Sequence, residues 1–563
     1  MHQLQQFINS LNKPKNYLLL ANVFLVFFLI LLNNLKIIPL RTGDFAFFAI
    51  LTLALAMYRP GWAFLFFIGT IPLENINLAP TELGIDIRPY QFIGALTIAA
   101  FLIRMATKRL NFKLAKLNLA DYLVIILVFS GFVSALAVGA IHELLLRLSV
   151  ILASFALLYF LARNYIQSVG DLKKVLPFFL SSSVIVTFYG IWQNWAFTHN
   201  LSDFEVMPGR PNATFTEADW LGGYLVLLIS VVYAYIYSCH SERSGAKSRN
   251  LPTAADDITI NRESYDYNSQ IPRLRPDEYI RTSLGMTRLF ALYFLLATLY
   301  IILILTVSRS AWLGAFAATF IFLFIAFTDL KFDHRNWRWK ETFFLKLKIL
   351  ASLAISLAVI YVFNLTNFQL FNRAQSTGTG LQKITISCPP YDWVCEIPDV
   401  IEDIKELEKC ECKQINLEDI EKSGGIILEV YRKDPNVKIR SQIYQKSWAE
   451  IKKHPILGIG WGNIGSILGT DERGASFNSS NIFLETWLGA GIIGFASIIV
   501  LFSYILLNSI KNYFFAQDQE NKVFYLFLII SWFAIIIPNL FNAGIFLGFL
   551  WVWLAVAQVS AEG

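Results

Sequence analysis

Arginines stand at the expected ends of two hydrophobic segments, where their side chains could bind an anion. Arg210 lies shortly before one such segment, and Arg309 begins another. A guanidinium group stays charged at any relevant pH and can hold two phosphate oxygens at once. The alternative is an ordinary anchor at a membrane boundary, because long cationic side chains extend toward the headgroups. Arg440 lies in a predicted helix, where it is either a solvated charge or a further contact to phosphate or sugar.

A glycine-rich stretch, HPILGIGWGNIGS (454–466), matches the dinucleotide-binding pattern G-x-G-x-x-G from Gly460 to Gly465. That pattern forms a nucleotide site only where a strand runs into the glycines and a helix leaves them. Here a predicted helix precedes the glycines, and no parallel sheet is predicted around them. We therefore expect no nucleotide site. Instead, the exposed amides of Gly460 and Gly462 are expected to form a wall of a site for a bulky or anionic ligand.

Membrane-spanning helices must position these residues. Of the 563 residues, 55% are hydrophobic and 16% are charged, whereas soluble domains average roughly 25% charged residues. Many windows of about 20 residues carry almost no charge, and this length crosses a bilayer. We predict an all-α polytopic membrane protein with about 12 to 14 transmembrane helices. The predicted spans are residues 17–34, 43–58, 60–76, 89–104, 119–138, 143–163, 175–197, 218–238, 289–307, 310–328, 349–366, 481–508, 522–540 and 541–559.

Lysine and arginine in the short loops predict the orientation of these helices. With the N-terminus in the cytoplasm, most of these cations fall on the cytoplasmic side, including the cluster from Arg104 to Lys116. This bias explains the formal net charge of +6 better than nucleic-acid binding does. The chain then divides into N-terminal transmembrane helices (1–238), a disordered cytoplasmic linker (239–288), transmembrane helices (289–366), one large external cap loop (367–480) and C-terminal transmembrane helices (481–563).

Four of the five cysteines fall in the predicted cap: Cys388, Cys395, Cys410 and Cys412. In an oxidising compartment, four cysteines form up to two disulfides with three possible connectivities. A zinc site is the alternative, but the spacing lacks the paired C-x2-C pattern of such sites. We therefore expect disulfides and no metal.

The cap also has periodic structure. Val400, Ile404 and Leu407 recur at helical spacing, and residues 424–431 (GGIILEVY) are typical of a short strand. A helix is predicted after Asp434-Pro435 and through residues 437–453. This helix places four side chains along one face: Arg440, Tyr444, Ser447 and Ile451.

Three segments together resemble the signature blocks of the O-antigen ligase and O-antigen polymerase family. They are GRPNATFTEADWLGGYL (209–225), LTVSRSAWLGAF (305–316) and HPILGIGWGNIG with SSNIFLETWLGAGIIGF (within 454–495). Members of this family are polytopic membrane glycosyltransferases that take a glycan from a polyprenyl pyrophosphate carrier. They transfer it to a hydroxyl of a lipid, glycan or protein acceptor on the outer side of the membrane. The resemblance implies no cofactor, no metal and no nucleotide sugar, and it implies a cell inner (cytoplasmic) membrane with the cap on the periplasmic side.

The resemblance also implies roles for individual residues. Arg210 and Arg309 are the arginines expected to hold the pyrophosphate, and Asn481 matches the asparagine that opens the next span. Ligases of the family typically have a histidine just before this asparagine, but here Ser480 takes that position. Serine is no general base at neutral pH unless a partner removes its proton.

Three explanations for the missing histidine stay open. Arginines that stabilise the leaving pyrophosphate could leave little need for a base. Another group could serve, foremost Glu485, because a carboxylate one turn into a span is costly unless it is partnered; pairing with an arginine is its structural alternative. Further candidates for a base are Asp471, Glu472 and His199. The third explanation is a relative with another acceptor or without transferase activity.

We therefore expect an O-antigen ligase-like glycosyltransferase that uses an undecaprenyl-pyrophosphate-linked glycan. A repeat-unit polymerase of the same family and a non-enzymatic, transporter-like relative are the alternatives. Several aromatic residues could stack on sugar rings, although aromatic residues also anchor proteins at membrane interfaces. They are Trp448, Tyr444, Trp461, Phe477 and Trp487.

Overall fold

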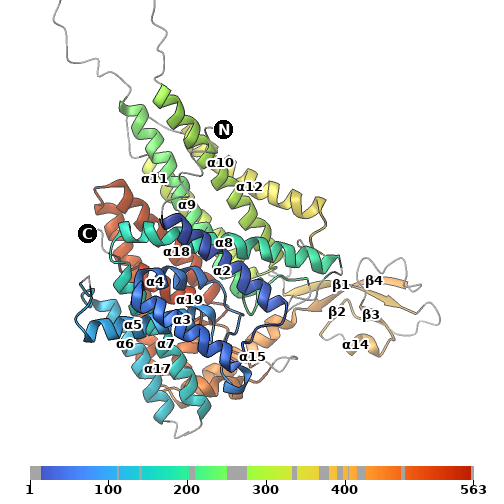
Figure 1. The fold of residues 1–563 in the computed structure, drawn as a ribbon. Helices are drawn as coiled ribbons and strands as arrows, with labels where there is room; N and C mark the ends of the chain where they lie inside the picture. Colours follow the sequence, from blue (N-terminus) through green and yellow to red (C-terminus); the bar gives the residue numbers. More distant parts are fainter. Residues whose placement is uncertain are drawn as a thin grey trace, which may run out of the picture.

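A body of helices forms most of the molecule, and a small sheet projects from it (Figure 1). The computed structural model describes residues 14–110, 113–137, 143–199, 201, 209–249, 276–331, 339–366, 370, 380–389, 397–402, 405–414, 426–470 and 476–559. Within these residues, ten helices are long and apolar enough to cross a membrane. The chain is a multi-pass membrane protein built mainly of helices, which confirms the predicted fold class.

The first half of the chain contributes helices α2 to α9. They are α2 (Pro14–Asn34), α3 (Thr42–Tyr58), α4 (Pro60–Thr70), α5 (Pro89–Ala106), α6 (Leu119–Ala137), α7 (Glu143–Tyr165), α8 (Val169–Thr198) and α9 (Ala218–Arg249). Proline opens both α4 and α5, at a position where its missing N–H would have no helical partner. Helix α4 has only 11 residues, so it is shorter than the span predicted over 60–76. A loop with a short 3-10 helix, η1 (Thr81–Leu83), follows it.

The second half contributes α10 (Pro276–Leu305), α11 (Arg309–Lys331), α12 (Trp339–Val362), α17 (Ile482–Phe515), α18 (Gln519–Asn539) and α19 (Gly548–Val556). The linker predicted to be disordered over 239–288 is helical at both ends, since α9 continues to Arg249 and α10 begins at Pro276. Residues 250–275, between these helices, lie outside the described part. Likewise, α19 fills only part of the span predicted over 541–559.

Small residues allow close packing of α9, α11 and α18. An ideal Cβ on Gly222 of α9 would lie 2.6 Å from the Cβ of Ala311 in α11. One on Gly314 of α11 would lie 2.9 Å from the ring of Pro538 in α18. Close approach of this kind is how helices associate in a membrane, where the hydrophobic effect between helices is weak. Of these closely packed helices, α11 contributes residues to the candidate site described below.

The insertion between α12 and α15 contains a four-stranded sheet, here called the insertion sheet. Its strands are β1 (Leu381–Cys388), β2 (Val400–Ile401), β3 (Lys413–Gln414) and β4 (Ile426–Lys433), in the order β2-β4-β1-β3. Strands β1 and β4 pair antiparallel from Leu381↔Lys433 to Cys388↔Ile426. One face is covered by a small core that includes Ile384, Ile386 and Val430.

Disulfide chemistry reinforces the insertion sheet. Cys388 and Cys412 form a disulfide with an S–S distance of 2.05 Å, and Cys410 is also disulfide-bonded. Cys395 lies outside the described residues. Because a sheet of this size has a small core, covalent links contribute an appreciable share of its stability.

The insertion differs in one respect from the sequence expectation. The helical spacing from Val400 to Leu407 predicted one helix, but the chain forms β2 and then the short helix α14 (Lys405–Glu408). Pairing explains this difference, since β2 runs parallel to β4 and matches Val400 with Tyr431. Backbone hydrogen bonds to a neighbouring strand thus override a weak local periodicity. By contrast, α15 (Pro435–Lys453) and β4 lie close to the predicted helix and strand.

The glycine-rich stretch inserts into an interruption of α17, here called the helix break (488–492). Gly491 has φ +66° and ψ −170°, a conformation essentially restricted to glycine. The Ile459 N–H donates to the carbonyl of Leu488 at 2.7 Å, and the Ile492 N–H donates to the carbonyl of Ile456 at 3.1 Å. The stretch thereby supplies hydrogen-bond partners where the regular pattern of α17 is interrupted. It then continues into η3 (Trp461–Asn463) and α16 (Ile464–Leu468).

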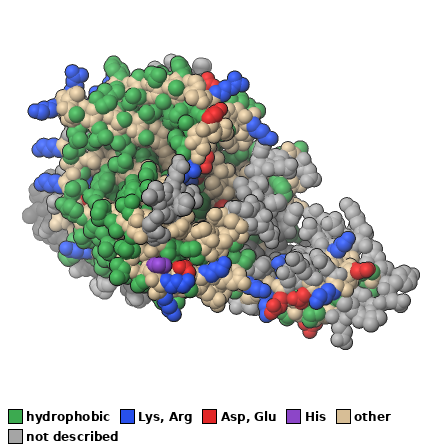
Figure 2. All heavy atoms as spheres, turned by 90° about the horizontal axis from the view of Figure 1, so that it is seen from below, with side chains coloured by type: hydrophobic (Ala, Val, Ile, Leu, Met, Phe, Trp, Pro, Cys, Tyr) green, Lys and Arg blue, Asp and Glu red, His purple; other side chains and the backbone are tan. Residues whose placement is uncertain are grey.

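The surface differs between the helical body and the insertion. Figure 2 shows hydrophobic side chains over much of the body, with lysine and arginine near its borders. Exposed phenylalanines of the body include Phe24, Phe129 and Phe316. The insertion sheet instead carries ion pairs between exposed side chains, Lys383 with Glu429 and Lys433 with Glu402. This contrast is typical of a body within lipid and an insertion in water.

Candidate functional site

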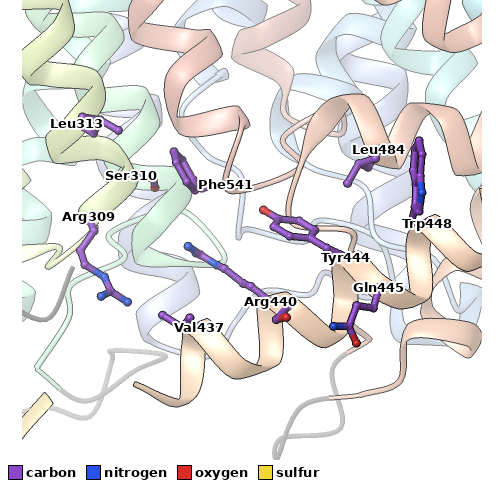
Figure 3. Close-up of a pocket in the computed structure, with 11 residues that line it drawn as sticks. Arg309, Ser310, Leu313, Val437, Arg440, Tyr444, Gln445, Trp448, Leu484 and Phe541 are labelled. Carbon is purple, nitrogen blue, oxygen red and sulfur yellow. The ribbon is translucent and has the colours of Figure 1, made fainter. Parts of the chain in front are cut away.

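A cavity of about 860 Å³ lies between α15, α11, the start of α17 and the loop that follows α18. Its described lining consists of Arg309, Ser310, Leu313, Val437, Arg440, Ser441, Tyr444, Gln445, Trp448, Leu484 and Phe541. Figure 3 shows Arg309 and Trp448 at opposite ends, with Arg440 between them and extending toward Phe541. The cavity thus has a cationic end and an aromatic end.

The turn between α10 and α11, residues 306–308, organises the cationic end. Val307 has φ +52°, which makes this turn tight. The Nε of Arg210 donates to the carbonyl of Thr306 at 2.9 Å. The Ser308 hydroxyl hydrogen-bonds Asp219 in the first turn of α9. One short turn therefore connects the loop before α9, the start of α9 and the start of α11.

Two of the three predicted arginines form ion pairs with carboxylates. The Nη2 of Arg210 lies 3.0 Å from Oδ1 of Asp219. The Nη1 of Arg309 lies 2.8 Å from Oδ2 of Asp434, whose side chain is fully buried. Asp434 directly precedes α15, so this second ion pair connects the start of α15 to α11. Both arginines are held in place, and of the two only Arg309 lines the cavity.

Arg440 differs from the other two arginines. In the described part of the chain, no carboxylate lies within ion-pair distance of Arg440. Its guanidinium lies 5.9 Å from the ring centre of Phe541, close enough for a cation–π contact. Arg440 also interacts electrostatically with Asp219, which places it near the Arg210 pair. The three arginines therefore converge, and Arg440 reaches the cavity without a carboxylate at ion-pair distance among the described residues.

The loop after α18 closes one side of the cavity and carries Phe541. The Nδ2 of Asn542 donates to the hydroxyl of Ser310 at 3.3 Å. The Nδ2 of Asn481 donates to the carbonyl of Leu540 at 3.1 Å. Asn481 also caps α17, since its Oδ1 accepts from the amides of residues 483 and 484. Asn481, predicted as a substrate contact, thus fixes both a helix start and this loop.

Ser480, which takes the place of the family's histidine, has φ +52° and does not line the cavity. Its carbonyl accepts a hydrogen bond from the Tyr444 hydroxyl at 3.4 Å. Partial burial raises the pKa of Tyr444, although Arg440 opposes this effect. Tyr444 therefore keeps its proton at neutral pH and acts as a donor. Neither side chain is equipped to remove a proton.

Glu485 is buried in the first turns of α17 and does not line the cavity. Its Oε2 accepts from the backbone N–H of Ser479 at 2.6 Å. Within the described residues, no arginine pairs with it, so its partner is the turn that precedes α17. This geometry gives Glu485 a role in holding the Ser479–Ser480 turn. Of the further candidates for a base, Asp471 and Glu472 lie outside the described residues, and His199 is exposed at the end of α8.

The glycine pair predicted to form a wall of the site lies elsewhere. An ideal Cβ on Gly460 would lie 3.3 Å from the Cα of Ala135 in α6. The next residue, Trp461, is buried against Gly489 of α17, where an ideal Cβ would overlap the indole ring. Neither Gly460 nor Gly462 lines the cavity. The stretch contributes packing and close backbone approach inside the body.

A comparison with known protein families matches part of the chain that contributes to this site. Residues 292–499 match the family model described as O-antigen ligase. This segment of the chain is therefore similar to the O-antigen ligase family. No curated protein and no solved structure matches the chain significantly. The matched segment includes Arg309, Arg440, Ser480 and the helix break, whereas Arg210 lies before it.

The candidate site also includes residues that the sequence analysis did not single out. Asp219 and Asp434 orient two arginines, and Phe541 lies against the third. The role of Asp219 could have been predicted from its position, since a carboxylate in the first turn of a span is costly without a partner. The roles of Asp434 and Phe541 could not, because their partners are distant in sequence. In the described residues, no cluster of three or more His, Cys, Asp or Glu side chains is arranged to hold a metal ion.

The site combines fixed positive charge with an apolar cavity. Arg309 and Arg440 can neutralise phosphate oxygens, and the aromatic side chains of the cavity can cover an adjoining group. Preorganised cations stabilise the charge that develops on a leaving phosphate in a transition state. The described residues bring no general base into the cavity.

Proposed function

We propose that the chain transfers a glycan from a polyprenyl pyrophosphate carrier to an acceptor hydroxyl, as an O-antigen ligase-like glycosyltransferase. The supporting observation is the convergence of Arg210, Arg309 and Arg440 at one end of the spanning helices. These arginines come from three distant parts of the sequence. A pyrophosphate attached to a membrane lipid is the anion that would reach this position at a bilayer surface.

The chemistry is a single displacement at the anomeric carbon. The acceptor oxygen forms a bond to that carbon while the bond to the pyrophosphate oxygen breaks, and the proton of the acceptor hydroxyl passes to solvent water. The pyrophosphate leaves on the carrier with an added negative charge, which Arg440 and Arg309 stabilise. Attack opposite the leaving group inverts the anomeric configuration. Retention of configuration in the product linkage would contradict this mechanism.

The protein is proposed to lie in the inner (cytoplasmic) membrane with its N-terminus in the cytoplasm. The cavity and the insertion sheet then face outward. The Cys388–Cys412 disulfide supports this orientation, because disulfides persist in oxidising compartments. The proposed partners are the lipid-linked glycan donor, an acceptor and the surrounding lipid, with no metal or cofactor.

Substitution of the arginines tests this function. Arg440→Gln should reduce glycan transfer roughly 100-fold, the typical effect of losing one charge-stabilising group. Lys438→Gln is the matched control, since Lys438 is exposed on the same helix and does not line the cavity. Arg210→Ala and Arg309→Ala should each abolish surface glycan while the protein still inserts into the membrane. Normal surface glycan in both arginine-to-alanine variants would refute the proposal.

A ligase and a polymerase of the same family differ in what accumulates when the gene is deleted. Full-length polymer on the lipid carrier would identify a ligase, and single repeat units on the carrier would identify a polymerase. Extraction of lipid-linked glycans and sizing by electrophoresis or mass spectrometry measures this directly. An unchanged carrier pool would argue for a non-enzymatic relative.

A further inference from the structure

The end of the cavity opposite Arg309 presents an exposed indole in a fixed orientation. Trp448 of α15 is 47% exposed and lines the cavity. Its ring meets that of Trp487 edge-on, with centroids 5.9 Å apart. Trp487 is itself stacked on Phe495 at 4.4 Å, and its Nε1 donates to the carbonyl of Pro455 at 3.0 Å. The Trp448 ring therefore packs against Trp487 and stays partly exposed where it lines the cavity.

Neutral polar side chains accompany this indole. Ser441 and Gln445 are exposed on α15, line the cavity and precede Trp448 by seven and three residues, so they share its helix face. A glutamine amide both donates and accepts hydrogen bonds, and a serine hydroxyl does the same. The charged members of the described lining are Arg309 and Arg440. A flat apolar face beside uncharged donors and acceptors fits a sugar ring, which has an apolar face and a rim of hydroxyls.

The position of this group in the cavity distinguishes the donor sugar from the acceptor. Arg440 and Trp448 are eight residues apart on α15, which is about 12 Å along the helix. This distance exceeds the length of one sugar ring. In a single displacement the attacking oxygen approaches opposite the leaving pyrophosphate. With pyrophosphate at the arginines and the donor sugar next to it, the acceptor would lie at Trp448.

We infer that Trp448, Gln445 and Ser441 form the subsite for the acceptor, and that the acceptor is a sugar rather than a protein side chain. This inference rests on the proposed transferase function. Trp448 stacks on the acceptor ring, and Gln445 and Ser441 hold its hydroxyls. Together they direct one hydroxyl toward the anomeric carbon. They are specificity-determining residues, because they bind the acceptor and take no part in stabilising the leaving group.

Kinetics of the full chain in lipid nanodiscs test the subsite. The donor is the polyprenyl-pyrophosphate glycan fraction extracted from a strain lacking the gene, and the acceptor is the glycolipid fraction of the same strain. Trp448→Ala and Gln445→Ala should raise the acceptor KM roughly tenfold, as expected when a central binding side chain is truncated. The donor KM and the inhibition by inorganic pyrophosphate should change less than about twofold. Trp448→Phe should restore part of the acceptor affinity.

Two further variants serve as controls. Gln442→Ala removes an exposed glutamine of α15 that does not line the cavity, and both KM values should stay unchanged. Arg440→Gln should raise the donor KM and weaken inhibition by inorganic pyrophosphate. A raised donor KM in Trp448→Ala, or unchanged acceptor KM in both Trp448→Ala and Gln445→Ala, would overturn the inference while the transferase function stands. Transfer by the wild type only to protein would overturn it too. No transfer at all by the wild type would contradict the proposed function itself.

Discussion

At the scale of single residues, Asp434 connects the start of α15 to the cationic end of the cavity. Its buried carboxylate pairs with Arg309, whose side chain is 17% exposed. Asp434→Asn should lower the free energy of unfolding by roughly 1–3 kcal/mol, since a buried polar group loses its charged partner. Thermal unfolding in detergent measures this change. Asp399→Asn, at an exposed position of the insertion, is the control. Equal melting temperatures for both variants would contradict the assignment.

Tyr444 should set no limb of the pH–activity profile. Burial raises its pKa above the usual value near 10, so the phenol stays protonated from about pH 6 to about pH 9. A raised pKa in the folded protein means that any stability linked to this proton is present below pH 10 and is lost only above it. Tyr444→Phe should therefore lower the rate, through the lost bond to Ser480, without shifting the profile. A loss of the alkaline limb in this variant would show that Tyr444 titrates during turnover.

At the scale of elements, the helix break fixes α15 relative to α17. An ideal Cβ on Gly491 would lie 2.1 Å from the carbonyl oxygen of Ile456, and one on Gly458 would lie 2.4 Å from that of Leu488. Both glycines also have positive φ. Gly491→Ala should destabilise the protein by more than about 1–3 kcal/mol, because strain and overlap add. It should also reduce transfer, because the arginine and aromatic residues of α15 move away from α11.

Gly223→Ala in α9 provides the matched control for this helix-break variant. The nearest atom to an ideal Cβ there is the Cβ of Pro538, at 3.9 Å, which is ordinary contact distance. Alanine also suits a helix interior better than glycine. The control should unfold at the same temperature as the wild type or slightly above it. If Gly491→Ala behaves like Gly223→Ala, the break is not what positions α15.

Local sequence signals predicted most single elements but few of the contacts between them. The amphipathic pattern of 437–453 predicted α15, and long apolar segments predicted most spans, because these signals lie within one element. Arg309 and Arg440 were recognised from their type and position, and the cavity brings them together. The roles of Asp434 and Phe541 depend on partners in other elements. The pattern from Gly460 to Gly465 does not contribute to the described lining of the cavity: Gly460 approaches Ala135 of α6, and Trp461 packs against Gly489 of α17.

At the scale of the whole molecule, the disulfides and the remaining cysteine report which side of the membrane each part faces. Cys388 and Cys412 are paired in the insertion sheet, whereas Cys239 lies near the far end of α9 and carries a thiol. In intact cells, a membrane-impermeant maleimide should label the insertion only after an impermeant reductant. Cys239 should react only after permeabilisation, because the proposed orientation places it in the cytoplasm.

A Cys239→Ser variant separates the two sources of label in this experiment. With Cys239 absent, reductant-dependent labelling of intact cells should persist, and permeabilisation without reductant should add none. Reduction should also unfold the insertion sheet locally, since a disulfide of this loop length contributes about 3 kcal/mol. The helical body should keep its melting temperature, because the helix break and the Arg309–Asp434 pair hold α15 independently of the sheet. Labelling of Cys239 from outside intact cells would invert the topology, and an outward-facing cavity would then be impossible.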